Sequence, residues 1–258
     1  MINLKTNKEI EIIRANGRIL AKTLELLGEK IKPGVKTKEL DRWAEDFIRR
    51  EGAYPAFKGY RGFPASICIS IDNEVVHGIP GERVIEEGQV ISVDIGVLKD
   101  NFYADGAFTF AVGPVSDQAK RLIKVTQEAL ERGLEFVREG IFLSDISYAI
   151  QSFVEENGFS VVRDLVGHGI GMNMHEEPQI PNFGSPGQGP ILKKGMVLAI
   201  EPMVNVGSFE IETRKDNWTI VTKDGSLSAH FEHTVAVTEN GAMILTDGDP
   251  SGKVKSFR

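Results

Sequence analysis

Residues 90–110, VISVDIGVLKDNFYADGAFTF, are the stretch of sequence that most constrains the fold. Two strand-like runs, at 89–98 and 102–112, alternate in polarity and are rich in β-branched residues, and Lys99-Asp100-Asn101 supplies a turn between them. Each run carries one carboxylate, Asp94 or Asp105, among apolar or small neighbours. If the hairpin is centred near Lys99 and Asp100, the two carboxylates face each other with Cβ atoms about 4.5–5.5 Å apart.

Two like charges in that position are destabilising unless a cation lies between them. A carboxylate in an apolar run is also costly to bury without compensation. The turn is not of the Asn-Gly type, so a register shifted by one residue would separate the pair. The hairpin therefore predicts either a metal site or two unrelated surface aspartates on an edge hairpin.

The histidines lie in short segments elsewhere in the chain. VVHGIP, GHGIGMNMHEE and SAHFEHT contain all five of them, namely His77, His168, His175, His230 and His233. Two more acids interrupt strand-like runs: Glu201 follows VLAI, and Glu232 lies within SAHFEHT. A lone Glu in a strand more often faces solvent, but two beside histidine-rich segments favour a shared site.

Four carboxylates with one imidazole form an oxygen-rich donor set. Such a set suits Mn²⁺, Fe²⁺, Co²⁺ or Zn²⁺. Shared carboxylates fit two metals about 3.5–4 Å apart, which activate a water and polarise a carbonyl. The HExxH motif of zinc proteases is absent. The spacing thus predicts metal-assisted hydrolysis without naming a substrate.

Helical patterns precede and follow the hairpin. Thr6-x-x-Glu9 is a capping box, and apolar residues at helical spacing continue to Ile31. A second helix is predicted at about 37–51, and two more at about 116–138 and 144–157. Residues 66–77 have the composition of a strand.

The helix pairs repeat at an offset of 106 residues, which maps Gly34 onto Gly140 and Gly52 onto Gly158. Any two amphipathic helices with glycine caps could match in this way, so coincidence is the alternative. A true duplication predicts two pseudo-symmetric halves, about 6–112 and 113–246, whose sheets form the floor of a central site. No linker-like or low-complexity segment divides them, so residues 1–258 are expected to form a single domain.

Composition narrows the functional classes. The net charge is −7, with no block of like charges, which argues against non-specific binding to nucleic acid or anionic membranes. The single cysteine, Cys68, excludes an intramolecular disulfide framework. The first residues lack the apolar core of a signal peptide, and no run reaches the length of a membrane span. A cytoplasmic protein is expected.

Taken together, VVHGIP, VDIGV, GHGIG, HEEPQIPN, EPM and WTIVTKDGSLSAHFEHT resemble the corresponding segments of type I methionine aminopeptidases. The resemblance extends from the first helix to about Thr246. It implies an α+β "pita-bread" fold, in which pseudo-two-fold halves of helix pairs pack on curved, mainly antiparallel sheets around a dimetal site.

The resemblance also implies a role for each donor. Asp94 would bind one metal, His168 and Glu201 the other, and Asp105 and Glu232 would bridge the two. His175 would hold the scissile carbonyl and His77 would hydrogen-bond near the scissile nitrogen, while Glu201 would shuttle a proton. The family's methionine pocket would map onto Tyr60, Phe63, Cys68, Met174 and Trp218, although a plain core role suits each of these equally well.

Phe63 and Met174 replace aromatic residues that are common in bacterial members of the family, and two positions beside the metal donors also depart from the family pattern. His230 stands where glutamine is common, and it could add a hydrogen bond behind the metal site or shift a pKa there. Gly106 follows Asp105 where a threonine or another larger residue is common, so one hydroxyl is missing.

The implied activity is removal of the initiator methionine from nascent chains and peptides whose second residue is small and uncharged. Two divalent ions per chain (Co, Mn, Fe or Zn), a monomer and a transient ribosome contact are expected, with no specific nucleic acid and no membrane partner. The alternatives are a proline-directed peptidase of the same fold and a non-enzymatic binding module.

Overall fold

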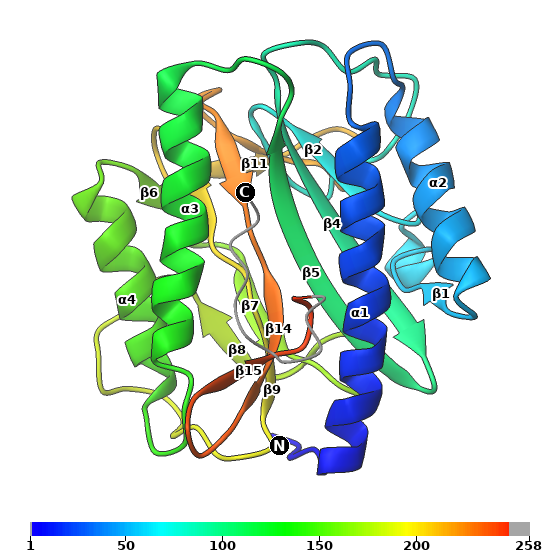
Figure 1. Ribbon diagram of the computed structural model, residues 1–258. Coiled ribbons are helices and arrows are strands. Elements are labelled where there is room, and N and C mark those ends of the chain that lie inside the picture. The colour runs from blue at the N-terminus through cyan, green and yellow to red at the C-terminus, as the bar shows by residue number, and fades with distance from the viewer. Residues whose placement is uncertain (1, 248–258) are drawn as a thin grey trace.

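A computed structural model describes residues 2–247 of the chain. Figure 1 shows two helix pairs standing side by side in front of the strands. The pairs consist of α1 (Asn7–Lys30) with α2 (Thr37–Arg50), and α3 (Asp117–Glu135) with α4 (Leu143–Glu156). All four predicted helices are therefore confirmed.

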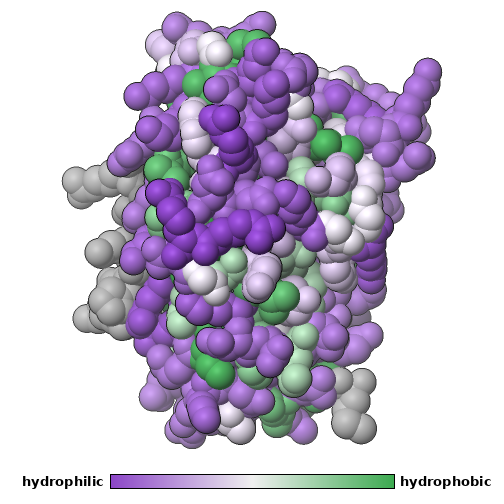
Figure 2. Space-filling model, turned by 90° about the vertical axis from the view of Figure 1, so that its right-hand side faces the viewer, coloured by the Kyte–Doolittle hydropathy of each residue, from purple (hydrophilic) through white to green (hydrophobic). Residues whose placement is uncertain are grey.

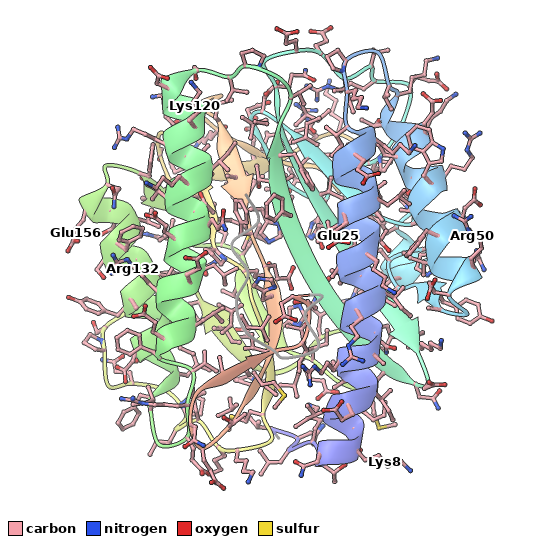
Figure 3. The ribbon with its side chains drawn as sticks, viewed as in Figure 1. Lys8, Glu25, Arg50, Lys120, Arg132 and Glu156 are labelled. Atoms are coloured by element: carbon pink, nitrogen blue, oxygen red, sulfur yellow. The ribbon has the colours of Figure 1, made fainter. Side chains whose placement is uncertain are left out.

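The first helix begins where the sequence predicts it. The Glu9 N–H donates to Thr6 Oγ1 at 3.4 Å, and the Thr6 N–H donates to Glu9 Oε2 at 2.7 Å, which completes the capping box. Figure 3 shows that charged side chains on the helices project outward, among them Lys8, Glu25, Arg50, Lys120, Arg132 and Glu156. The α2 side of the molecule is mostly hydrophilic, with small scattered hydrophobic areas (Figure 2).

Antiparallel sheets lie behind the helices. In the first sheet, β4 (Val90–Lys99) pairs along its whole length with β5 (Phe102–Ala111), and its other edge pairs with β2 (Cys68–Ile71) and, further along, with β1 (Tyr54–Pro55). The second sheet has the order β15-β14-β9-β7-β8, formed by Ala242–Ile244, His233–Val237, Val197–Ile200, Val166–Gly169 and Glu176–Pro181. The predicted α+β architecture, helix pairs on mainly antiparallel sheets, is confirmed.

Two three-stranded sheets complete the framework. One has the order β13-β10-β6, formed by Ser228–His230, Met203–Asn205 and Ser160–Val161. The other has the order β11-β12-β3, formed by Ile211–Thr213, Ile220–Thr222 and Glu74–Val76. The prediction of one continuous strand at 66–77 is wrong, because two strands lie in this range. The chain turns at Asp72, where φ is +59°, and this turn separates β2 from β3.

Each helix pair covers its own part of the core. Leu20, Leu27, Leu40 and Ile48 pack with residues of β2 and β4 in one cluster. Leu122, Leu130, Ile146 and Ile150 pack with residues of β9 and β14 in another. The partly buried Phe108 on β5 packs against both clusters and joins them. Within residues 2–247, no helix combines the length and the apolar character needed to cross a membrane.

The register of the central hairpin differs from the predicted one. Lys99 pairs with Phe102, so only Asp100 and Asn101 form the turn, with φ of +52° and +64°. Positive φ at both central residues is the signature of a type I′ turn, whose twist matches that of the strands. Asp94 therefore pairs with Ala107, and Asp105 with Gly96, so the expected direct pairing of the two aspartates is wrong. The two carboxylates are diagonal neighbours on one face.

Candidate metal centre

The five predicted donors converge from both halves of the molecule. Asp94 lies on β4 and Asp105 on β5, while His168 lies on β7. Glu201 directly follows β9, and Glu232 directly precedes β14. All five line one cavity with a volume of about 150 Å³.

Glu201 lies in the short gap between β9 and β10, and Glu232 lies in the short gap between β13 and β14. Ile200 pairs with His233 on one side of these gaps, and Met203 pairs with His230 on the other. The pairing register of β9 with β14 in the five-stranded sheet is therefore continued by β10 with β13 in the three-stranded sheet. This places the two glutamates opposite each other.

Hydrogen bonds across the middle of the molecule fix two of the donors. Thr234 Oγ1 donates to the Asp105 carbonyl at 2.7 Å and accepts from the Asp105 N–H at 3.0 Å. The Glu232 N–H donates to the Ala107 carbonyl at 3.0 Å. Because β5 belongs to the first half and β14 to the second, the site lies where the halves meet.

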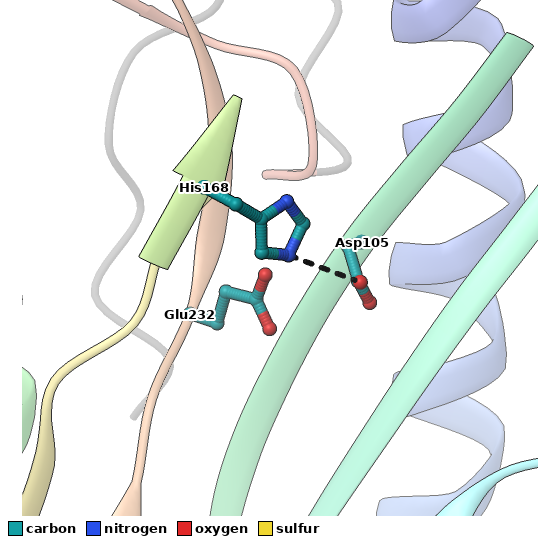
Figure 4. A group of neighbouring side chains, drawn as sticks. All are labelled: Asp105, His168 and Glu232. Atoms are coloured by element: carbon teal, nitrogen blue, oxygen red, sulfur yellow. Dashed lines mark ion pairs between the residues drawn. The ribbon is translucent and has the colours of Figure 1, made fainter. Parts of the chain in front are cut away.

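His168 presents a free nitrogen to the acids. Its Nδ1 lies 2.9 Å from the Gly169 carbonyl, which can accept only if Nδ1 carries the proton. The Nε2 lone pair then faces Asp105 Oδ2 at 4.0 Å and Glu201 Oε1 at 3.7 Å. Figure 4 shows the imidazole turned toward Asp105, with Glu232 beside it. Donor atoms of these three buried residues all lie within 4.8 Å of one another.

Burial controls the ionisation of the site. It raises the pKa of Asp94, Glu201 and Glu232 well above the usual carboxyl range. It raises the pKa of Asp105 to about 7, despite the Gly106 N–H that donates to this carboxylate. Burial lowers the pKa of His168, so this imidazole is neutral and able to act as a ligand.

The donor set fits a divalent metal. Among the described residues, the ion-pair partners of Asp105, Glu201 and Glu232 are histidines rather than lysine or arginine. Asp94 Oδ1 and Glu232 Oε1 are buried and have no hydrogen-bond partner in the part of the chain that the structure describes. Buried carboxylates with unsatisfied oxygens require protons or a cation, and a metal would satisfy several of them at once.

Aromatic and imidazole side chains form the rest of the cavity wall. Tyr60 OH lies 2.8 Å from His175 Nδ1, and the His175 and His168 rings are 4.2 Å apart. Phe63 packs edge-on against Trp218 at 5.1 Å between ring centroids. His77 lines the same cavity with φ of +59°, a left-handed conformation that is rare outside glycine and typical of functional sites.

The cavity differs in three places from the predicted residue set. Met174 is buried behind the cavity, in the space that the absent side chain of Gly96 leaves open, and does not line it. Phe57 and Arg61 line the cavity without having been predicted, because no spacing pattern marks them in the sequence. The buried His230 approaches Glu201, whereas His233 turns to Thr246 Oγ1 at 2.9 Å.

Gly106 lies where α1 crosses the hairpin. A Cβ at this position would stand 3.1 Å from a Leu20 methyl and 3.4 Å from the Glu232 carbonyl. A larger residue would press on both, so close packing of α1 on β5 accounts for the glycine in this chain.

Buried carboxylates around a neutral imidazole, at the floor of a cavity, define a metal-dependent hydrolase site. The sequence profile of metallopeptidase family M24 matches residues 11–239. The chain therefore belongs to metallopeptidase family M24, whose members use divalent metal ions.

Individual relatives are similar over nearly the whole chain. Methionine aminopeptidase 1 of Bacillus subtilis is 56% identical over 246 residues, which are 95% of this chain and 99% of the relative. The Escherichia coli methionine aminopeptidase is 48% identical over 247 residues, covering 95% and 94%.

The solved structures agree. The crystal structure of methionine aminopeptidase from Thermotoga maritima has a TM-score of 0.94 and 45% identity, covering 95% of this chain and 99% of that one. The prolidase from Pyrococcus horikoshii, at 23% identity and a TM-score of 0.76, shares the fold over 63% of its own chain. These matches confirm the predicted pita-bread fold.

Proposed function

We propose that this chain is a methionine aminopeptidase, which removes the N-terminal methionine from nascent proteins and peptides whose second residue is small and uncharged. One observation carries the proposal: Asp94, Asp105, His168, Glu201 and Glu232 line the same cavity as an aromatic slot. The names and the high identity of the relatives support it.

The slot suits a thioether side chain. Phe63, Trp218 and Tyr60 supply apolar and aromatic surface, and Cys68 adds a sulfur contact. Burial, assisted by the nearby Asp94, raises the pKa of the Cys68 thiol, so no thiolate charge would repel an apolar ligand. The family resemblance implies that Met174 lines the methionine pocket, but we propose only that it packs behind this slot.

We propose two divalent ions, of Co, Mn, Fe or Zn, held by Asp94, Asp105, His168, Glu201 and Glu232. When bound, they supply Lewis acidity, which polarises the scissile carbonyl and makes water nucleophilic at neutral pH. Glu201 would take the proton of the attacking water and deliver it to the leaving amine.

His175 and His77 would act on the peptide bond. Burial, with the neighbouring His168, lowers the pKa of His175 to about 4, so the imidazole is neutral. Tyr60 OH can donate to Nδ1 of His175, which leaves Nε2–H as the donor toward a developing oxyanion. His77, whose pKa burial also lowers, would hydrogen-bond near the scissile nitrogen.

We further infer that residues 1–258 form one domain with an internal repeat, about 6–112 and 113–246. The bounds of α2 and α4, Thr37–Arg50 and Leu143–Glu156, differ by the same offset of 106 residues as the sequence match. Gly34 and Gly140 share positive φ, at +91° and +87°, as do Gly52 and Gly158, at +70° and +77°. A monomeric, cytoplasmic enzyme that contacts the ribosome transiently is part of the same proposal.

Peptide hydrolysis tests the proposed specificity. We expect the metal-loaded protein to release methionine from Met-Ala-Ser but not from Met-Lys-Ser, because the proposed activity requires a small, uncharged second residue. Chelation of the metal should abolish the release. Cleavage of Xaa-Pro peptides without any cleavage of Met-Ala-Ser would instead support a proline-directed peptidase, and metal binding without any hydrolysis would indicate a binding module.

A further inference from the structure

His230 is a buried imidazole at the metal centre to which the proposed mechanism gives no role. It ends β13, two residues before Glu232, and its side chain is only 2% exposed. Its Nε2 is buried and has no hydrogen-bond partner within residues 2–247. An unsatisfied imidazole nitrogen in the interior costs free energy unless a ligand completes it.

The Nε2 atom points at two of the metal-binding carboxylates. It lies 3.7 Å from Glu201 Oε2 and 4.0 Å from Glu232 Oε2. These distances are too long for hydrogen bonds. They match those of His168, whose Nε2 lies 3.7 Å from Glu201 Oε1 and 4.0 Å from Asp105 Oδ2. Each oxygen of Glu201 therefore faces a different imidazole.

Such separations are those of donors that share a cation. Metal–nitrogen and metal–oxygen distances are about 2.0–2.2 Å, so two donors on one ion stand about 3–4 Å apart. The backbone of His230 is held in place, since its N–H donates to Thr109 Oγ1 at 3.0 Å and Thr109 Oγ1 donates to its carbonyl at 2.7 Å. The imidazole therefore approaches the carboxylates from a fixed strand end.

We propose that His230 Nε2 is an additional donor to the divalent metal centre, on the side where Glu201 and Glu232 meet. The centre would then hold two imidazoles rather than one. This inference rests on the metal site of the proposed function. It differs from the five-donor pattern that the family resemblance implies, in which a glutamine is common at this position.

Metal titration of His230→Gln tests the proposal. Calorimetry with Co²⁺ should show binding to one site weakened by about 10–100-fold or more, the range typical for loss of groups that support a metal site. His233→Gln is the matched control, because it removes a partly buried imidazole on the other side of Glu232 that faces Thr246. Its Co²⁺ affinity should equal that of the wild type.

Proton NMR of the Co²⁺-loaded protein gives a readout independent of activity. Ring protons of a metal-bound imidazole are shifted out of the normal spectral range. The wild type should show two such imidazoles, and His230→Gln only one. If the wild type shows only one shifted imidazole and His230→Gln keeps the Co²⁺ affinity of the wild type, the additional-donor inference is overturned and the proposed function is not. No Co²⁺ binding by the wild type would instead overturn the proposed function. Circular dichroism of each metal-free variant separates a lost ligand from a lost fold.

Discussion

At the scale of single residues, the proposed mechanism divides the histidines of the cavity into a metal ligand and groups that face the substrate. His168 has a lone pair aimed at Asp105 and Glu201, whereas His77 lies beside Trp218 at 6.4 Å between ring centroids. His168 is buried and His77 is partly buried, and the groups beside each ring distinguish their proposed roles.

Alanine substitution should separate these two histidines. His168→Ala should lose both metal and turnover, because it removes a donor. His77→Ala should lower kcat by about 10²-fold or more, as expected for loss of a hydrogen-bonding group at the reacting centre, with metal content near that of the wild type. Elemental analysis and kinetics on the same samples check both expectations. Metal loss in His77→Ala would make His77 a ligand instead.

At the scale of elements, the β4–β5 hairpin sets the relative position of two proposed ligands, Asp94 and Asp105, through a two-residue turn. Asp100 and Asn101 are both exposed and both adopt positive φ. A shift of one residue in the register would move Asp105 to the opposite face. The turn therefore bears directly on the metal site.

Asn101→Val should destabilise the protein by about 1–2 kcal/mol, the cost of a left-handed conformation for an ordinary residue. This corresponds to a fall in Tm of about 2–4 °C per kcal/mol for a chain of this size. Asn101→Gly is the control, and it should keep or raise Tm, because glycine adopts positive φ without strain. Equal Tm values for the two variants in thermal unfolding would contradict the assigned turn.

The hairpin also shows how far sequence reasoning reaches. The alternating pattern predicted both strands, and the two isolated acids predicted the metal site. The register depended on whether two or three residues formed the turn, which composition leaves open when no Asn-Gly pair is present. Phe57, Arg61 and the approach of His230 to Glu201 come from contacts between distant segments, and no local pattern encodes them.

At the scale of the whole molecule, the metal centre joins the two halves. Asp94 and Asp105 belong to the first half, and His168, Glu201 and Glu232 to the second, and each half has its own apolar core. A bound metal therefore links the two cores and stabilises the folded state in proportion to its affinity. Without metal, protons must neutralise the buried carboxylates.

The metal-free protein should become less stable as pH rises from about 6.5 to 8, the range in which Asp105 gives up the proton it retains on folding. Burial raises the pKa of Asp94, Glu201 and Glu232 well above the usual range and that of Asp105 to about 7. The folded state then binds more protons than the unfolded state. Stability falls by about 1.4 kcal/mol per pH unit for each proton retained.

The buried histidines do not interfere in this window. Their lowered pKa values, about 3 for His230 and about 4 for His233, reduce stability only below the unfolded value of about 6.5. Thermal unfolding with chelator should therefore show Tm falling from about pH 6.5 to 8, and added Mn²⁺ should remove most of that fall. A metal-free Tm that rises or stays constant over this range would contradict the ionisation assigned to the site.

The central claim is that five donors from two halves hold the metal that drives methionine release. Its most direct test starts from metal-free protein, to which one kind of divalent ion is added in each titration. Hydrolysis of Met-Ala-Ser and the number of metal ions bound per chain are measured on the same samples. Activity should be absent at the start and rise with bound metal up to two ions per chain. Full activity in the metal-free protein, or activity unrelated to bound metal, would contradict the claim.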